Sequence, residues 1–219
     1  MAFSLEQIDT YINALLVNAA ALIRESQILY DHEAYARAFS LAHLAREEIA
    51  KTLMLHATGV RILAGHPVDF KKLKRRLRDH KQKLIAETIN NVVLCAGIDL
   101  DFAESMLQVS SSAPDFRNDQ KNNSLYVGFE NGLVSQPLES ASENRAFRTI
   151  TLAADALTNQ MAIFKISGPF ATREPINIPE ISPEDIKFDS KTLQILGEIY
   201  AIALSKSREQ ENTDPAEKS

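Results

Sequence analysis

Apolar residues recur at helical spacing along most of the chain, with polar residues between them. The first pattern starts at Ser4 and Gln7, which are spaced as a capping box, and predicts a helix to about Tyr30. Later patterns predict helices over about 31–64, 69–93, 98–110, 138–166 and 190–206. One short stretch, 125–130, is β-like. We therefore expect an all-α fold in a single domain, residues 1–206, followed by a disordered polar tail, 207–219.

Two titratable residues interrupt the apolar stripes of consecutive predicted helices. Glu48 follows Ala45 at helical spacing in the second helix, and His80 takes a core-facing position in the third. Burial of an unpaired carboxylate is costly, so Glu48 requires a partner. Because consecutive helices in a bundle run antiparallel, the pattern predicts that Glu48 and His80 approach one another, with Lys51 and Lys83 nearby.

The same spacings are also compatible with a purely structural role. Glu47 and Glu48 lie four and three residues before Lys51, so either could form an ion pair with it on a helix surface. His80 could likewise be a satisfied core histidine beside a solvated basic face. Spacing alone leaves the structural and the chemical interpretation open.

A basic segment stands out in a chain whose net charge is -5. Residues 71–83 contain eight Lys or Arg residues, enough to contact phosphates. The segment lacks the interleaved aromatic residues of a single-strand stacking platform, so base-specific recognition is not indicated. Cations close to His80 disfavour its charged form, which suits a general base. The candidate phosphate contacts in this segment are Lys71, Lys72, Lys74 and Arg78.

Several classes of protein are disfavoured by composition. The single cysteine, Cys95, excludes an internal disulfide framework and a cysteine-based zinc site. His43 and Glu47 are four residues apart, but the repeated Glu-x-x-His of a di-metal helical bundle is missing, so we expect no metal and no other cofactor. The chain has no apolar run of membrane-spanning length and no basic leader at its start. We expect a cytoplasmic protein that is not bound to a membrane.

Three segments of the sequence resemble one protein family. Residues 36–51, an Ala-rich run ending in Glu-Glu-Ile-Ala-Lys, resemble the helix of the AbiV-type HEPN proteins that ends in Glu-Glu-Leu-Gly-Lys. Residues 79–83 resemble the family's Asp-His-x-x-Lys segment, and residues 125–129, soon after Lys121, resemble its Leu-Tyr-Val-Asp-Tyr element. Ala50 replaces the family's Gly, and Gly128 its Asp. The resemblance covers about residues 15–166.

The resemblance implies an HEPN-like antiparallel helical bundle with additional C-terminal helices, often a homodimer. It implies a role in prokaryotic abortive infection, the defence that limits phage growth. Active HEPN proteins are metal-independent ribonucleases whose Arg-x4-6-His motif forms a site shared across a dimer, and Arg75 and His80 match that spacing. Expected partners are RNA, a second copy of the chain, and a phage protein activator or an antitoxin.

Each candidate residue receives a role on this basis. We expect His80 to act as the base, oriented by Glu48. Positive charge would come from Arg75, Arg76 and Lys83, with Lys51 and Lys121 as further phosphate contacts. Two alternatives remain. One is a non-catalytic module that recognises a phage protein or a nucleotide, with a structural Glu/His/Lys cluster, and the other is a metal-dependent enzyme on a helical bundle.

Overall fold

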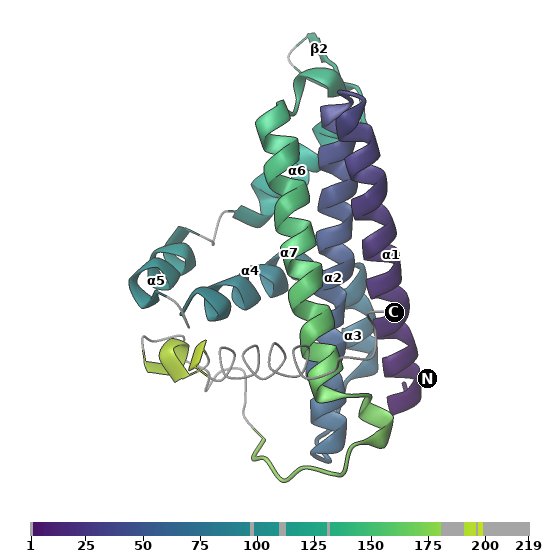
Figure 1. Cartoon of the computed structure of the whole chain (residues 1–219), viewed down its shortest axis with the longest axis vertical. Helices are drawn as coiled ribbons and strands as arrows, with labels where there is room; N and C mark the ends of the chain where they lie inside the picture. Colours follow the sequence, from purple (N-terminus) through teal and green to yellow (C-terminus); the bar gives the residue numbers. More distant parts are fainter. Residues whose placement is uncertain are drawn as a thin grey trace, which may run out of the picture.

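Three long helices form the body of the protein. The computed structural model describes residues 2–96, 99–109, 113–130, 132–180, 191–195 and 197–198. The helices α1 (Leu5–Asp31), α2 (Tyr35–Leu63) and α7 (Glu143–Ser167) run alongside one another down the long axis (Figure 1). The shorter helices are α3 (Phe70–Arg78), α4 (His80–Ala96), α5 (Leu100–Val109) and α6 (Ala113–Leu125). The predicted all-α fold is confirmed.

The remaining elements of the described chain are small. The strands β1 (Gly128–Glu130) and β2 (Leu133–Ser135) form an antiparallel hairpin in which Phe129 lies opposite Val134. Short 3-10 helices, η1 (Pro137–Glu139) and η2 (Phe170–Thr172), flank α7. Residues 191–195 and 197–198 are helical, as expected there, whereas the predicted tail lies outside the described residues.

The start of α1 follows the expected capping box. Ser4 Oγ accepts a hydrogen bond from the Gln7 backbone N–H at 3.2 Å, and the Gln7 side chain accepts one from the Ser4 backbone N–H at 3.0 Å. This reciprocal pair satisfies two backbone donors that helix geometry leaves without a partner. The apolar stripe that follows buries Ile8, Ile12 and Leu15 in the core.

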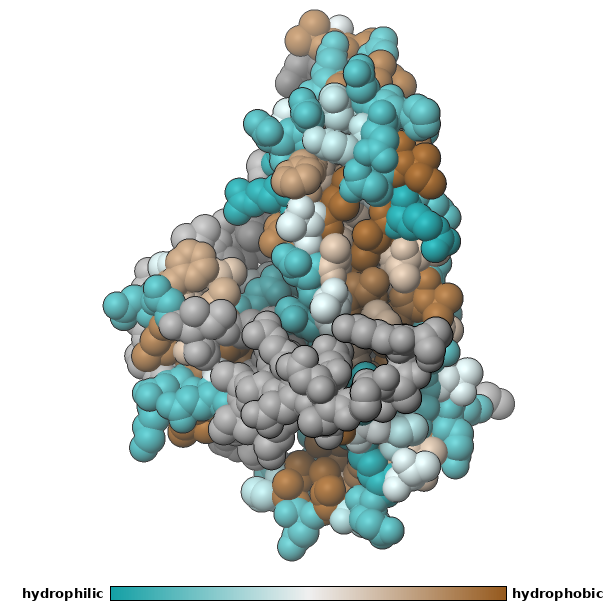
Figure 2. Space-filling view, viewed as in Figure 1, coloured by the Kyte–Doolittle hydropathy of each residue, from teal (hydrophilic) through white to brown (hydrophobic). Residues whose placement is uncertain are grey.

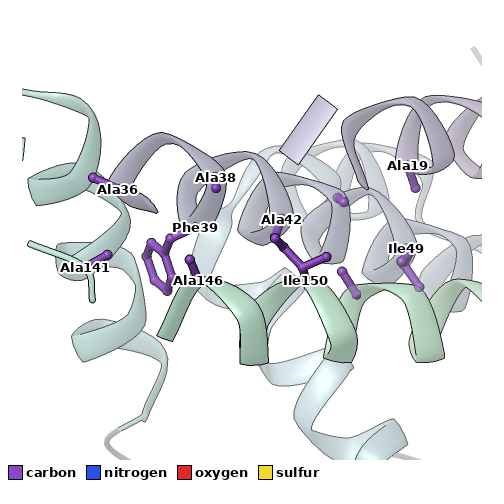
Figure 3. Packing of buried hydrophobic residues seen from close by; sticks show 11 residues of the cluster. Ala19, Ala36, Ala38, Phe39, Ala42, Ile49, Ala141, Ala146 and Ile150 are labelled. Atoms are coloured by element: carbon purple, nitrogen blue, oxygen red, sulfur yellow. The ribbon is translucent and has the colours of Figure 1, made fainter. Parts of the chain in front are cut away.

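The second helix, α2, is the centre of the fold, because α1, α3, α4, α6 and α7 all contact it. Its buried residues therefore lie around most of its circumference rather than on one stripe. Where α7 packs against it, alanines predominate, including Ala38 and Ala42 on α2 and Ala146 on α7 (Figure 3). Small side chains let the helices approach closely, and Ile150 fills the space between them.

The chain after α7 folds back over the other end of the bundle. Gly168 ends α7 with a φ of 65°, a conformation that favours glycine. The backbone N–H groups of Phe170 and Ala171 then donate to the Asp9 carboxylate at 2.8 and 2.9 Å. The Phe170 ring is fully buried, and a Cβ atom on Gly59 would lie 2.7 Å from it. The absence of a side chain at Gly59 is what lets the ring seat on α2.

Two predicted segments differ from the structure. The helix expected over 69–93 is divided into α3 and α4 at Asp79, whose backbone is extended and whose carboxylate accepts from the Gln82 N–H. Asp79 thereby caps the second helix and places His80 in its first turn. Residues 115–124, which are polar and for which the apolar pattern predicts no helix, are helical and belong to α6.

Apolar side chains also reach the surface. On the face shown in Figure 2 they follow the seam between α1 and α7, where Leu16, Val17 and Met161 line a groove. None of the helices in the described part of the chain has the length and apolar character needed to cross a bilayer.

Candidate functional site

A buried carboxylate, Glu47, lies where α2 meets α4 and α6. Its exposure is only 2%. His80 Nδ1 lies 2.7 Å from one of its oxygens and 2.9 Å from the other. Lys83 Nζ donates to Oε2, and Lys121 Nζ donates to Oε1 at 3.2 Å. Two helices, α4 and α6, therefore supply three donors to one carboxylate on α2.

The contact with Glu47 determines which nitrogen of the His80 ring carries the hydrogen. A carboxylate only accepts hydrogen bonds, so Nδ1, which faces both of its oxygens, carries a hydrogen and donates. In the neutral ring the other nitrogen, Nε2, then holds the lone pair and can accept a proton. The His80 side chain is 49% exposed, unlike the groups that hold it. This is the arrangement of a histidine base oriented by an acid.

The two lysines give this site a surplus of positive charge. The side chains of Lys83 and Lys121 are each 6% exposed, and one carboxylate, Glu47, faces both. Their Nζ atoms also lie 3.4 and 3.2 Å from His80 Nδ1. Two ammonium groups against one carboxylate leave a net positive charge beside the half-exposed ring, where a phosphate would be attracted.

The environment keeps Glu47 ionised. Burial by itself raises the pKa of its carboxyl group, but interactions with His43, Lys83 and His80 outweigh that effect and hold the pKa well below its usual range. His43 approaches from the neighbouring turn of α2, with Nε2 3.5 Å from Glu47 Oε1. Burial lowers the pKa of His43, which favours its neutral form.

A second buried ion pair joins α2 to α4 close by. Arg46, next to Glu47 in the chain, donates through Nε to the carboxylate of Glu87. Both side chains are 6% exposed. The pair helps to fix α4, whose first turn carries His80, against the central helix.

The expected contact between Glu48 and His80 is wrong by one residue. Glu47 holds the histidine, whereas Glu48 accepts from Lys51 Nζ at 2.6 Å, with about a fifth of each side chain exposed. The prediction assumed that α2 buries a single stripe that contains Glu48. Because other helices cover α2 on several sides, Glu47 is buried as well. Glu48 and Lys51 form the surface pair that was the structural alternative.

The arginines of the Arg-x4-His spacing lie on a different helix from His80. Arg75 and Arg76 are exposed on α3, and Arg76 Nε donates to Gln82 Oε1 at 3.2 Å. Because the chain turns at Asp79, the helical face that the spacing implied does not exist. A role for the two arginines in charge stabilisation stays a prediction.

The other basic residues divide into surface and core. Lys71, Lys72 and Arg78 are exposed on α3, and Lys74 is half-buried with Nζ 5.3 Å from the centre of the Phe3 ring. They remain candidates for phosphate contact. Lys121 instead lies in the buried cluster on Glu47. Its role as a phosphate contact stays a prediction.

Sequence reasoning missed the central role of Glu47. A signal was available, since His43, Glu47 and Lys51 recur every four residues and so share one side of α2. The position of Lys121 shortly before the Leu-Tyr-Val element was noted, but its contact 74 residues back along the chain could not be read from local spacing.

Comparison with protein families assigns the chain. The family model described as AbiV, of the HEPN group, matches residues 7–158. The chain belongs to the AbiV family. Glu47, His80, Lys83 and Lys121 all lie within the matched region, so the residues that meet at the buried carboxylate are in the part that defines AbiV-type abortive-infection HEPN proteins. The expected family and its helical fold are confirmed. Neither a curated protein nor a solved structure matches the chain.

The described residues of this AbiV-family chain also bear on metal binding. No group of three or more histidine, cysteine or acidic side chains comes together there in a way that could hold a metal ion. The cluster on Glu47 is instead dominated by ammonium groups, which repel cations.

Proposed function

We propose that this AbiV-family protein limits phage growth as a metal-independent endoribonuclease of the cytoplasm, with His80 as its base. The observation that supports this proposal is the half-exposed His80 ring, which donates through Nδ1 to buried Glu47 beside two lysines. A ribonuclease that uses no metal needs a base and a source of positive charge at the phosphate. Both are present at this one position.

In the proposed reaction, His80 Nε2 removes the proton from a ribose 2′-hydroxyl. The 2′ oxygen attacks the adjacent phosphorus, the bond to the 5′ oxygen breaks, and that oxygen takes a proton from water. The hydroxide that remains takes up the proton held by His80, which returns the ring to its neutral form. The products are a 2′,3′-cyclic phosphate and a 5′-hydroxyl. The imidazolium formed on His80 is stabilised by Glu47, while the surplus charge of Lys83 and Lys121 offsets the charge that develops on the phosphate.

The exposed cations of α3 extend this site. Asp79 separates α3 from His80 by a single residue, so the basic helix ends directly beside the proposed base. Lys71, Lys72 and Arg75 offer contacts to the phosphates that flank the cleaved bond. Such contacts position a strand without reading its bases.

A second candidate function rests on the burial of the cluster. In this alternative the cluster is purely structural: two lysines that are 6% exposed and a carboxylate that is 2% exposed join α2, α4 and α6. The protein would then act as a binding module, with a phage protein or a nucleotide as its ligand. The exposure of His80, which a purely structural cluster does not require, favours the catalytic proposal. The partners proposed from the family resemblance are a second copy of the chain and a phage protein activator or an antitoxin.

The test is cleavage of total cellular RNA by purified protein, with and without EDTA. We expect cleavage that EDTA does not affect and that falls by about 100-fold or more in His80→Ala. His32→Ala is the matched control, since His32 is exposed at the end of α1, and it should cleave as the wild type does.

Three outcomes separate the candidates. Undiminished cleavage by His80→Ala would remove His80 as the base. Absence of cleavage by the wild type, even with phage components present, would favour the binding module. Activity lost in EDTA and restored by a divalent metal would favour a metal-dependent enzyme.

A further inference from the structure

The hairpin of β1 and β2 lies at the end of the bundle where α1 passes into α2 (Figure 1). Large apolar side chains in and around the hairpin face solvent. Six of them are more than 60% exposed: Tyr126, Val127, Phe129, Leu133, Val134 and Leu138. Scattered single apolar residues are normal at a protein surface, but a contiguous group of this size often marks a contact with another protein.

The backbone of β2 has an edge that the hairpin leaves unpaired. Glu130 and Leu133 lie opposite one another on either side of a two-residue loop. In such a hairpin the pair next to the loop is hydrogen-bonded and the following pair, here Phe129 and Val134, is not. The N–H and C=O groups of Val134 therefore point away from β1, toward the free edge. A two-stranded hairpin is only marginally stable in water, and a further strand on this edge would stabilise it.

The charge of the hairpin favours a second copy of the chain as that further strand. Residues 132–138, which include β2, contain no charged residue, whereas β1 ends in Glu130. Edge strands are commonly protected from pairing by charged residues or proline within the strand, and β2 has neither. Because the chain has a net charge of -5, two copies repel one another overall, and an uncharged edge lets them meet without opposing like charges.

The residues of β2 also suit pairing with themselves. Two copies related by a twofold axis at Val134 pair antiparallel, so that each Val134 lies opposite the other and their outward N–H and C=O groups meet. Since Phe129 lies opposite Val134 within each hairpin, these residues and their copies form one unbroken apolar row across four strands. A contact of this symmetry closes after two copies.

The exposed surface is large enough for a specific contact. Side chains of this size and exposure present on the order of 800 Å² in each copy, about the area that each partner of a specific complex buries. The apolar row across the strands and the side chains that flank it would supply this contact.

We propose that two copies of the chain associate through the free edge of β2, in a four-stranded antiparallel sheet of order β1-β2-β2-β1. This names the surface and the register of a self-association that the proposed function leaves open. It does not rest on RNA cleavage, because none of the hairpin residues takes part in the proposed reaction.

The test is sedimentation velocity on the full chain. We expect the mass of two 24.4 kDa chains at about 10 μM protein, since interfaces of this size have dissociation constants from μM to pM. Val134→Lys places an ammonium group opposite its own copy on the twofold axis, and it should raise the dissociation constant by about 100-fold or more. Val17→Lys is the matched control, because Val17 is 63% exposed on α1, and it should leave the dimer intact.

Cysteine substitutions test the register. In the proposed sheet the Cα atoms of the two Val134 residues are about 5.5 Å apart, within disulfide range, whereas the two Phe129 residues are three strand spacings, roughly 14 Å, apart. Val134→Cys should therefore form a disulfide-linked dimer in air, and Phe129→Cys should not. The wild type, whose single cysteine is Cys95, provides the blank.

Both positions are exposed, so their replacement should leave the fold intact, which circular dichroism would verify. A monomer throughout the micromolar range would overturn the proposal and leave the β2 edge to a different partner. A dimer unchanged by Val134→Lys, or a disulfide formed as readily by Phe129→Cys, would also overturn it. Because the readout is mass and not cleavage, failure here leaves the test of RNA cleavage unaffected.

Discussion

Adjacent carboxylates on α2 have very different surroundings, which makes them a matched pair for mutation. Replacement of Glu47 by Gln leaves Lys83 and Lys121 buried without their anion, and loss of one partner from a buried pair costs about 3–5 kcal/mol. Glu48→Gln breaks only the partly exposed pair with Lys51, worth about 0–1 kcal/mol. Urea unfolding of the two variants should show this difference in the free energy of unfolding. Equal losses would contradict Glu47 as the buried centre.

A second titratable residue, His56, predicts how stability varies with pH. Burial, followed by the charge of Arg173, lowers the pKa of His56 from 6.5 to about 4. The folded state therefore resists a proton that the unfolded chain accepts below pH 6.5. Stability should fall as the pH drops from about 6.5 to about 4, by up to about 3 kcal/mol at 1.36 kcal/mol per pKa unit.

The variant His56→Gln isolates this effect. It removes the titrating group, so the free energy of unfolding measured from pH 7 to pH 4 should decline less steeply than in the wild type. The exposed His32 provides the control, since His32→Gln should keep the wild-type slope. A slope unchanged by His56→Gln would show that other groups, such as buried His43, carry the pH dependence.

At the scale of helices and strands, the packing of Phe170 on Gly59 predicts that Gly59→Ala lowers the free energy of unfolding when Phe170 is present and raises it when Phe170 is absent. A methyl group at Gly59 would lie within 2.8 Å of three ring atoms of Phe170, so Gly59→Ala should destabilise by about 1–3 kcal/mol. In a Phe170→Ala background the ring is absent, and alanine is the better helix former by about 0.8–1.0 kcal/mol. There Gly59→Ala should stabilise. A double-mutant cycle by urea unfolding measures both, and the same sign in both backgrounds would refute the contact.

Prediction of helices from the sequence succeeded where the pattern of apolar residues alone is enough to locate the helix. The stripes of α1, α2 and α7 gave their positions to within a few residues, because each helix buries a continuous apolar surface. The break at Asp79 was missed because no glycine or proline marks it. Asp79 followed by Gln82 at capping spacing was the only signal, and an internal aspartate reads equally well as a helix residue.

Helix α6 was missed for a different reason. Polar contacts hold its described end against α2: Ser124 shares a buried hydrogen bond with Ser40, and Lys121 donates to Glu47. Periodicity counts only apolar residues, so a helix docked by a hydroxyl and an ammonium group looks like a polar loop. Only part of the candidate site was predicted, because the site too is held by polar contacts. Spacing identified His80 and Lys83, but not the carboxylate that they contact.

Across the whole molecule, the exposed cations of α3 predict salt-dependent binding of RNA. Each phosphate contact to a single strand contributes about 0.7 to the slope of log K against log salt concentration. Neutralisation of three α3 cations should lower that slope by up to about 2 and weaken binding equally across sequences. Fluorescence anisotropy with a labelled RNA at several salt concentrations measures it. The variants are Lys71→Gln, Lys72→Gln and Arg75→Gln combined.

A control with the same loss of charge distinguishes the α3 surface from net charge. It replaces three exposed cations elsewhere with glutamine, namely Arg24 on α1, Arg37 on α2 and Lys165 on α7. If this control lowers the slope as much as the α3 variant, the α3 surface is not the contact.

The three groups that donate to Glu47 from other helices come from positions 80, 83 and 121, so the site cannot be complete until more than half of the chain has been made. Chains leave the ribosome from the N-terminus, and a domain generally folds as a unit. A growing chain therefore cannot complete the charge at Glu47 before Lys121 has emerged. If the proposed nuclease activity is correct, a chain still attached to the ribosome lacks a finished site through the first half of its synthesis.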